Sequence, residues 1–263
     1  MASIYNMVAD VYTTVLHHSD HRSDEWFLMG SPWPVLFIGI SYLYFVKSLG
    51  PCLMKNRPAF NLDRTIRMYN LVQIILCAFL FKMLYDLEWG RKYRIFCEPL
   101  DYTSPRGLHA AKLMYMYFLL KVFDLCDTVF FVLRKKSNQV TFLHVYHHIM
   151  MLFTVWAATK FVPGGHGEMV VYVNSFVHVV MYSYYFMTSM WPQYRNNLWW
   201  KKYITQLQMI QFVFIGLHAY SALLIKDCIY SRIMATVTGT QSLLVFIMFY
   251  NFYRKSYLRR KVM

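Results

Sequence analysis

Seven long apolar runs constrain the fold of this chain more than any other feature of its sequence. They cover residues 34–49, 66–87, 108–133, 140–161, 169–191, 203–225 and 233–253. Most of them approach the ~20 residues with which an α-helix crosses the hydrocarbon core of a bilayer, although the first is short. Hydrophobic residues make up 57% of the chain and charged residues only 15%, against about 25% charged residues in soluble domains. The sequence therefore predicts an all-α integral membrane protein of about seven transmembrane helices, with a single membrane domain over residues 1–263.

The distribution of basic residues predicts how the chain crosses the membrane. A net charge of +14 would suggest a nucleic-acid partner in a soluble protein, but most Lys and Arg here lie in the first, third and fifth loops and at the C-terminus. Cytosolic loops carry an excess of Lys and Arg. We therefore expect residues 1–31 to form a polar lumenal N-terminus and residues 254–263 a basic cytosolic tail. Contact with membrane lipid then explains most of the charge, no nucleic acid is expected as a partner, and a share of the charge remains for an acidic substrate.

The expected topology also separates the five cysteines. Cys97 lies in the second loop and Cys228 in the sixth, both on the non-cytosolic side. Cys77 and Cys126 lie within apolar runs, and Cys52 faces the cytosol. If the non-cytosolic side is oxidising, Cys97 and Cys228 are the pair able to bridge. We predict this disulfide, and two free thiols are the alternative.

The third apolar run contains charged residues, which are rare at membrane depth and mark functional sites by default. Lys121, Asp124 and Thr128 lie on one face of the expected helix, with Asp127 beside them. Lys121 and Asp124 can pair at i, i+3. These residues either support a polar site or form a structural ion pair between helices.

Three histidines, His144, His147 and His148, lie near the start of the fourth run. Their spacing of three and four residues crowds three imidazoles on one side of one helical turn. A lone buried histidine is usually satisfied within a protein core, but three within five positions are hard to explain in that way. We interpret this group as functional.

The fifth and sixth runs add polar residues at helical spacing. They are Asn174, His178, Tyr182 and Tyr185 in the fifth run, and Thr205, Gln208 and Gln211 in the sixth, with His218 farther along. At 1.5 Å per residue, the polar groups of these four runs lie roughly 10–20 Å from the cytosolic end. We therefore expect one site in the cytosolic half of the membrane, although hydrogen bonding between helices is an alternative role for the amides.

Two kinds of enzyme chemistry use buried histidines of this type. A di-iron desaturase or hydroxylase needs many imidazole ligands, and His-x-x-His-His resembles one box of such a site because imidazole suits iron. This chain has one box, and its further histidines His178, His218 and His109 are isolated, so we expect neither a metal nor another cofactor. Without a metal, a neutral imidazole can act as a nucleophile, a general base or a hydrogen-bond donor near pH 7.

Four blocks in order resemble the very-long-chain fatty acid elongases, the membrane 3-oxoacyl-CoA synthases, and the resemblance extends from the first apolar run to the last. The segment from Lys121 to Thr128 resembles the family's Lys-x-x-Glu-x-x-Asp-Thr, with Asp124 where Glu is usual. The other three blocks are His144-Val-Tyr-His147-His148, Asn174-x-x-x-His178-x-x-Met181-Tyr182-x-Tyr184-Tyr185 and Thr205-x-x-Gln208-x-x-Gln211. The exchange at Asp124 shortens one side chain by a methylene group and leaves the assignment in place.

The resemblance implies a reaction and a fold. An elongase condenses an acyl-CoA with malonyl-CoA, which gives a 3-oxoacyl-CoA two carbons longer, CO2 and CoA. The implied fold has seven helices, of which the last six enclose a narrow acyl tunnel. By analogy, we hypothesise that His147 attacks the thioester to form an acyl-imidazole and that His178 holds the reacting carbonyl. His144, His148 and Asn174 would orient groups and stabilise charge, and the supporting polar site would comprise Lys121, Asp124, Asp127, Thr128, Tyr182, Tyr185, Gln208 and Gln211.

CoA carries phosphates, so we expect basic residues at the mouth of the site. The candidates on the expected cytosolic rim are Arg134, Lys135, Lys136, Lys201, Lys202, Arg254 and Lys255. Lipid contact and topology are the alternative role of these residues.

The resemblance also implies a cellular setting. It places the chain in the endoplasmic reticulum membrane, with the 3-oxoacyl-CoA reductase, the dehydratase and the enoyl-CoA reductase of that membrane as partners. The tail Arg259-Arg260-Lys261 resembles a dilysine-type retrieval signal. A non-enzymatic seven-helix receptor or transporter is the remaining alternative, but its polar groups would more naturally line a route across the membrane.

Overall fold

A computed structural model describes residues 17–89, 93–191, 193–194 and 198–258, and these ranges contain helices and loops but no strand. The described part has seven long helical segments, one over each predicted apolar run, so the predicted all-helical fold is confirmed. They are α2 (Trp33–Tyr44), continued by a π-turn (Phe45–Leu49) and α3 (Gly50–Met54); α4 (Asp63–Trp89); α5 (Pro105–Asp124) with α6 (Cys126–Leu133); α7 (Phe142–Phe161); α8 (Glu168–Met190); α9 (Leu198–Leu224); and α10 (Arg232–Tyr253), continued by a π-turn (Arg254–Leu258). Short 3-10 turns occur at His21–Ser23, Ser137–Gln139 and Gly165–Gly167.

Local sequence sets several of the helix boundaries. Hydroxyl groups cap the first turns of α5, α7 and α10, where the side chains of Ser104, Thr141 and Ser231 accept hydrogen bonds from backbone N–H groups. Such residues are favoured as N-caps because they satisfy amides that have no partner within the helix. The turn between α7 and α8 needs positive φ at Gly164 (117°) and Gly165 (58°), a region that glycine enters without steric cost.

One helix differs from the continuous run expected from the sequence. Residues 108–133 contain a tight turn at Leu125, whose N–H bonds to the Val122 carbonyl three residues back at 3.3 Å. The turn separates α5 from α6 and lies between Asp124 and Asp127. The break therefore falls within the predicted polar site.

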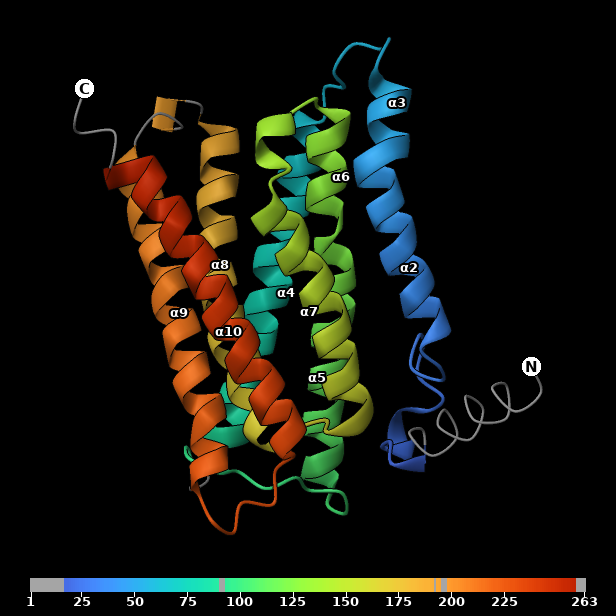
Figure 1. The fold of residues 1–263 in the computed structure, drawn as a ribbon, viewed down its shortest axis with the longest axis vertical. Coiled ribbons are helices and arrows are strands. Elements are labelled where there is room, and N and C mark those ends of the chain that lie inside the picture. Colours follow the sequence, from blue (N-terminus) through green and yellow to red (C-terminus); the bar gives the residue numbers. More distant parts are fainter. Residues whose placement is uncertain (1–16, 90–92, 192, 195–197, 259–263) are drawn as a thin grey trace.

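Figure 1 shows an elongated bundle with α2 and α3 at one edge and α9 beside α10 at the other. In between, α4 packs along α8 and α5 packs against α7. At one end, which we call the basic end, α3, α6, α8 and α10 finish. At the other end, which we call the disulfide end, lie the connections that precede α5 and α10 (Figure 1).

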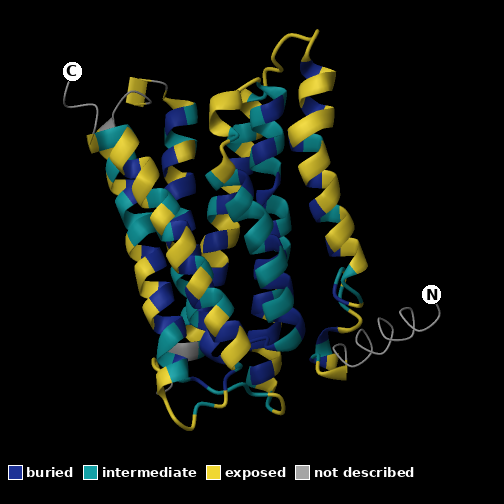
Figure 2. Ribbon diagram, viewed as in Figure 1, coloured by how far each residue is buried: buried dark blue, intermediate teal, exposed yellow. Residues whose placement is uncertain are grey.

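The outer surface of the bundle is apolar, as a membrane protein requires. Large hydrophobic side chains such as Phe37 (73% exposed), Ile40 (66%) and Leu217 (68%) point outward, and Figure 2 shows the buried positions facing inward. Among the described residues, four helical segments are both long and apolar enough to span a bilayer: Trp33–Met54, Asp63–Leu87, Trp199–Leu224 and Arg232–Leu258. The other long segments are α5 with α6, α7 and α8, which carry the predicted polar site.

The structure contains the predicted disulfide between Cys97 and Cys228. It links the connection before α5 to the connection before α10, two segments that are 131 residues apart. Backbone contacts tie further chain to the same end: His166 N–H donates to the Glu98 carbonyl at 3.0 Å and Asp20 N–H donates to the Lys160 carbonyl at 2.8 Å. The disulfide end is therefore closed by loops and by the segment that precedes α2.

Candidate active site

A buried ion pair occupies the centre of the bundle. Lys121 Nζ, on α5, donates to Asp124 Oδ2 at 2.8 Å, and each residue is only 3% exposed. The ammonium group also lies 4.7 Å from the centre of the Tyr117 ring, which is within reach of a cation–π attraction. The predicted i, i+3 pairing is confirmed. Removing only one of two such partners would leave an uncompensated charge in an apolar environment.

The helix α4 completes the hydrogen bonding of this pair. Gln73 Nε2 donates to Asp124 Oδ1 at 2.7 Å and to the Tyr69 hydroxyl at 2.8 Å. The hydroxyl of Tyr182, on α8, donates to Asp127 Oδ2 at 2.8 Å. We call Gln73, Lys121, Asp124, Asp127 and Tyr182 the ion-pair cluster. It joins the three helical segments α4, α5–α6 and α8 through side chains alone.

The three clustered histidines differ in their surroundings. His144 Nε2 lies 2.8 Å from the Thr128 hydroxyl, which is itself 2.7 Å from the hydroxyl of Tyr42 on α2. The His148 ring lies 4.3 Å from the His144 ring and 5.8 Å from the His147 ring, centre to centre. The hydrogen bonds of the described residues hold His144 but leave both ring nitrogens of His147 without a protein partner.

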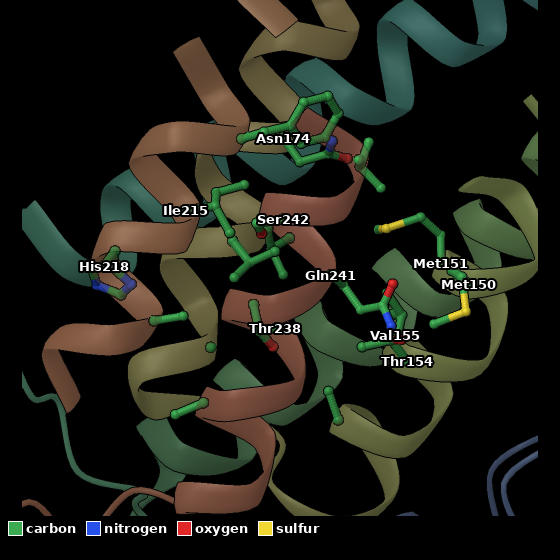
Figure 3. Close-up of a pocket in the computed structure, with 18 of the residues that line it drawn as sticks. Met150, Met151, Thr154, Val155, Asn174, Ile215, His218, Thr238, Gln241 and Ser242 are labelled. Atoms are coloured by element: carbon green, nitrogen blue, oxygen red, sulfur yellow. The ribbon is translucent and has the colours of Figure 1, made fainter. Parts of the chain in front are cut away.

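A cavity begins at His147 and continues along one face of α7. Five helices line it: α5 through Met114 and Tyr117, and α7, α8, α9 and α10 through side chains that include Met150, Met151, Asn174, Ile215, Thr238, Gln241 and Ser242 (Figure 3). Of the three clustered histidines, His147 alone lines the cavity. Its free nitrogens therefore meet the space into which a substrate could enter.

Asn174, His178 and Gln211 lie around the same part of the bundle. Asn174 Oδ1 accepts a hydrogen bond from the Tyr117 hydroxyl at 2.8 Å, and both Asn174 and Gln211 line the cavity. His178 is buried, with its Nδ1 4.0 Å from Asp124 Oδ2 and without a hydrogen bond. The structure therefore brings the predicted residues of α5, α7, α8 and α9 together.

Of the predicted supporting residues, Gln211 alone lines the cavity, and two of the others also lie outside the hydrogen bonds of the ion-pair cluster. The Gln208 amide contacts the Met181 sulfur at 3.4 Å, and Tyr185 is 41% exposed, with its ring 6.0 Å from the Tyr182 ring. Both stay near the ion-pair cluster without taking part in its hydrogen bonds.

The predicted CoA-binding residues gather at the basic end, at the ends of α6, α8, α9 and α10. Arg134 bonds to Asp63 at 3.0 Å, which neutralises part of its charge, and Lys135 donates to the Lys55 carbonyl at 3.4 Å. The tail residues Arg259, Arg260 and Lys261 lie outside the described residues. The basic end thus carries exposed positive charge at the same end of the bundle as the three clustered histidines.

Gln73, Tyr69, Tyr42 and Tyr117 belong to the site but escaped the sequence analysis. Gln73 gave a usable signal, because an amide within an otherwise apolar run usually has a partner on another helix. The tyrosines gave none, since the chain has 22 of them. In the part of the chain that the structure describes, no three His, Cys, Asp or Glu side chains come close enough together to hold a metal ion.

Comparison with known proteins gives one consistent family. Residues 27–263 match the model of the ELO family, described as GNS1/SUR4. The chain is 41% identical to a very long chain fatty acid elongase of Aedes aegypti over 99% of its own length and 73% of the relative's. It is 38% identical to very long chain fatty acid elongase 7 of Rattus norvegicus, over 94% of this chain and 89% of the relative. It is 37% identical to very long chain fatty acid elongase 1 of Homo sapiens, over 97% of this chain and 92% of the relative. The resemblance seen in the four sequence blocks is confirmed, and this chain belongs to the ELO family.

Proposed function

We propose that this protein is a fatty acid elongase that condenses an acyl-CoA with malonyl-CoA to give a 3-oxoacyl-CoA two carbons longer, CO2 and CoA. Its family and the printed names of its relatives support this activity. The structural observation that carries the proposal is the position of His147. Among the three clustered histidines, it alone faces the cavity, and its ring nitrogens have no protein partner among the described residues. A neutral imidazole in this state can act as a nucleophile.

The proposed reaction has two stages. In the first, a ring nitrogen of His147 attacks the thioester carbonyl of the acyl-CoA, a C–N bond forms, the C–S bond breaks and CoA leaves as the thiol with the proton of the imidazole. In the second, malonyl-CoA loses CO2, and the enolate left behind attacks the acyl-imidazole carbonyl. A C–C bond forms, the C–N bond to His147 breaks, the released imidazole nitrogen takes up a proton from solvent, and the 3-oxoacyl-CoA leaves.

Neighbouring residues have separate roles in this proposal. Asn174, fixed by the Tyr117 hydroxyl, and His178 stabilise negative charge on the reacting carbonyl oxygen, because donors aimed at a developing oxyanion lower the barrier. His144 and His148 keep His147 in position. The ion-pair cluster holds α4, α5–α6 and α8 at fixed distances, so it positions the site without contacting substrate.

The placement of the substrates follows from the two ends of the bundle. The acyl chain occupies the cavity that continues from His147, and the last six of the seven helical segments enclose it: five line it, and α4 packs outside them against α5 and α8. The CoA phosphates meet the basic end, through residues such as Arg134, Lys201 and Lys255. In this proposal the basic end faces the cytosol and the disulfide end faces the lumen of the endoplasmic reticulum, where the other three enzymes of elongation share the membrane.

The test is incorporation of labelled malonyl-CoA into 3-oxoacyl-CoA by membranes that carry the wild type, His147→Ala or His109→Ala, over a panel of acyl-CoA lengths. His109 is an exposed histidine outside the cavity, which makes it a matched control. We expect turnover by the wild type and the control, and a loss of at least about a thousandfold in His147→Ala, as for other nucleophile substitutions. Incubation with acyl-CoA alone should add the acyl mass to a peptide that contains His147.

Wild-type turnover that survives in His147→Ala would keep the elongase activity but assign the nucleophile to another residue. A complete lack of turnover by folded wild-type protein at every chain length would refute the proposed function.

A further inference from the structure

The far end of the cavity is polar, although an unsubstituted acyl chain ends in a methyl group. The cavity lining on α7 extends from His147 to Ala158, which is about 16 Å at 1.5 Å per residue. Near the disulfide end it is lined by His166 and His218. Their rings stack with centres 3.8 Å apart and planes 10° apart, and the Tyr230 ring lies 5.4 Å from His166.

Each of these imidazoles has one ring nitrogen that is buried and has no hydrogen-bond partner. His166 is 2% exposed and His218 is 6% exposed. His166 Nε2 donates to the His218 carbonyl at 2.8 Å, so Nδ1 of the neutral ring is an acceptor, and this Nδ1 has no partner. Burial lowers the pKa of His166, which favours the neutral ring. His218 Nε2 is also buried without a partner.

An unpartnered buried polar atom is costly, so native structures normally supply a partner. An alkyl terminus cannot supply one. A carboxylate can only accept, which does not match the acceptor nitrogen of His166, and its charge would be buried without a counter-ion. A hydroxyl group donates one hydrogen bond and accepts others, so it suits the His166 acceptor whichever tautomer His218 has.

We propose that the His166–His218 end of the cavity binds the terminal hydroxyl group of a hydroxylated acyl chain, whose thioester end lies at His147. This inference rests on the proposed elongase activity and names a substrate class for the same cavity. Thr238, Gln241 and Ser242, which α10 contributes to the cavity (Figure 3), provide further polar groups on the way to this end.

The test uses wild-type protein and pairs of acyl-CoAs that differ only in a terminal hydroxyl group, over a series of chain lengths. We expect kcat/KM to favour the hydroxylated member by roughly tenfold, the effect of one or two added hydrogen bonds. This preference should appear only over the narrow range of lengths that carries the chain end to His166 and His218. At shorter lengths, the hydroxyl group would not reach His166 and His218, so the hydroxylated member should have no such advantage in kcat/KM.

Two variants assign the preference to the imidazoles. His166→Phe and His218→Phe keep a flat ring in the stack and remove the nitrogens, so in each the ratio of kcat/KM between the hydroxylated and the unsubstituted chain should fall to about one. His109→Phe makes the same exchange at an exposed histidine outside this cavity and should keep the preference.

Equal use of hydroxylated and unsubstituted chains by the wild type at every length would overturn the inference and leave these nitrogens to buried water. Persistence of the preference in both cavity variants would overturn the assignment to His166 and His218. Failure of the folded wild type to elongate any chain, hydroxylated or unsubstituted, would overturn the proposed function itself, so the two failures are distinguishable.

Discussion

The two polar regions of this molecule both contain ion pairs with buried members, but only the disulfide end is also closed by a covalent bond between loops. The ion-pair cluster joins helices through side chains, with both members of the Lys121–Asp124 pair buried. The disulfide end joins loops through the Cys97–Cys228 bond and through backbone groups such as the Glu98 carbonyl. Charges inside an apolar bundle are costly and are tolerated where they are paired. The disulfide end contains such pairs too, Lys160 with Asp24 and Glu168 with Arg106, but its loops are linked in addition by a covalent bond and by backbone hydrogen bonds.

The difference separates what each region contributes. The ion-pair cluster lies beside His147 and fixes the spacing of the helices around the reacting groups. The disulfide end fixes where the cavity stops and which groups meet the end of the acyl chain. Damage to the ion-pair cluster should therefore reduce stability and turnover together, whereas damage to the disulfide end should change stability and chain selectivity more than turnover.

The largest effect is expected at the buried ion pair. Lys121→Met leaves Asp124 charged and buried, so we expect about 3–5 kcal/mol of lost stability, the usual result of breaking one side of a buried pair. The measurement is thermal unfolding in detergent, with turnover in parallel. Lys82→Met is the matched control, because Lys82 pairs with Asp86 at 2.5 Å on an exposed surface and such pairs contribute under about 1 kcal/mol.

A second variant sharpens this prediction. The double substitution Lys121→Met and Asp124→Leu removes both charges, so most of the lost stability should return without a return of turnover. If Lys121→Met and Lys82→Met destabilised the protein equally, the ion-pair cluster would not be the stabilising region described here.

The next largest effect is expected at the disulfide. Cys97→Ser opens a link between positions 131 residues apart, for which the chain-entropy relation gives about 4–5 kcal/mol. Helices that persist in the unfolded membrane state reduce this value, so we expect about 2–4 kcal/mol from thermal unfolding with and without reductant. Cys52→Ser, at a free exposed cysteine, should unfold like the wild type. A loss of stability in Cys97→Ser that is matched by Cys52→Ser would contradict the prediction.

A smaller effect is expected at Thr128, where α6 contacts α7 and α2. Thr128 bonds to both Tyr42 and His144, and Thr128→Val leaves these two groups without their partner. We expect about 1–3 kcal/mol of lost stability and reduced turnover, because His144 no longer has a fixed orientation. Thr128→Ser keeps the hydroxyl group and should retain most of the turnover. If Val and Ser behaved alike, the hydroxyl group would not orient His144.

The polar site around His147 was largely predictable from sequence because most of its members recur at helical spacing. Lys121, Asp124 and Thr128, the three clustered histidines, and Asn174 with His178 each follow periods of three or four residues within apolar runs. Such periods place side chains on one helical face. Their partners on other helices, Gln73 and Tyr42, could not be paired with them, because the sequence does not give the rotation of one helix about its axis relative to another.

The disulfide end was less predictable because its contacts join loops and backbone groups. The Cys97–Cys228 bond followed from the expected topology, but the stacking of His166 on His218 did not. These residues are 52 positions apart, and His166 lies in a glycine-rich turn that indicates only a helix end. The backbone N–H and the Nε2 of His166 bond to carbonyl groups, which every residue has, so residue type gives no signal of the partner.

The smallest effect is expected at Asp101, on the disulfide end, where a carboxylate holds the turn before α5. It accepts hydrogen bonds from the Ser104 hydroxyl, from Ser104 N–H at 3.0 Å and from Thr103 N–H at 3.1 Å. These bonds, that of the Ser104 hydroxyl foremost, lower the pKa of Asp101 to about 2.

Because the folded-state pKa lies below the unfolded value of 3.8, the added stability is present above about pH 4 and is lost as the pH falls through about 2. Solvent screening at this half-exposed position keeps the effect of Asp101→Asn under about 1 kcal/mol. Thermal unfolding of the wild type and Asp101→Asn should therefore differ slightly at pH 6 and converge towards pH 2, whereas a difference that grows on acidification would show that the charge does not stabilise this end.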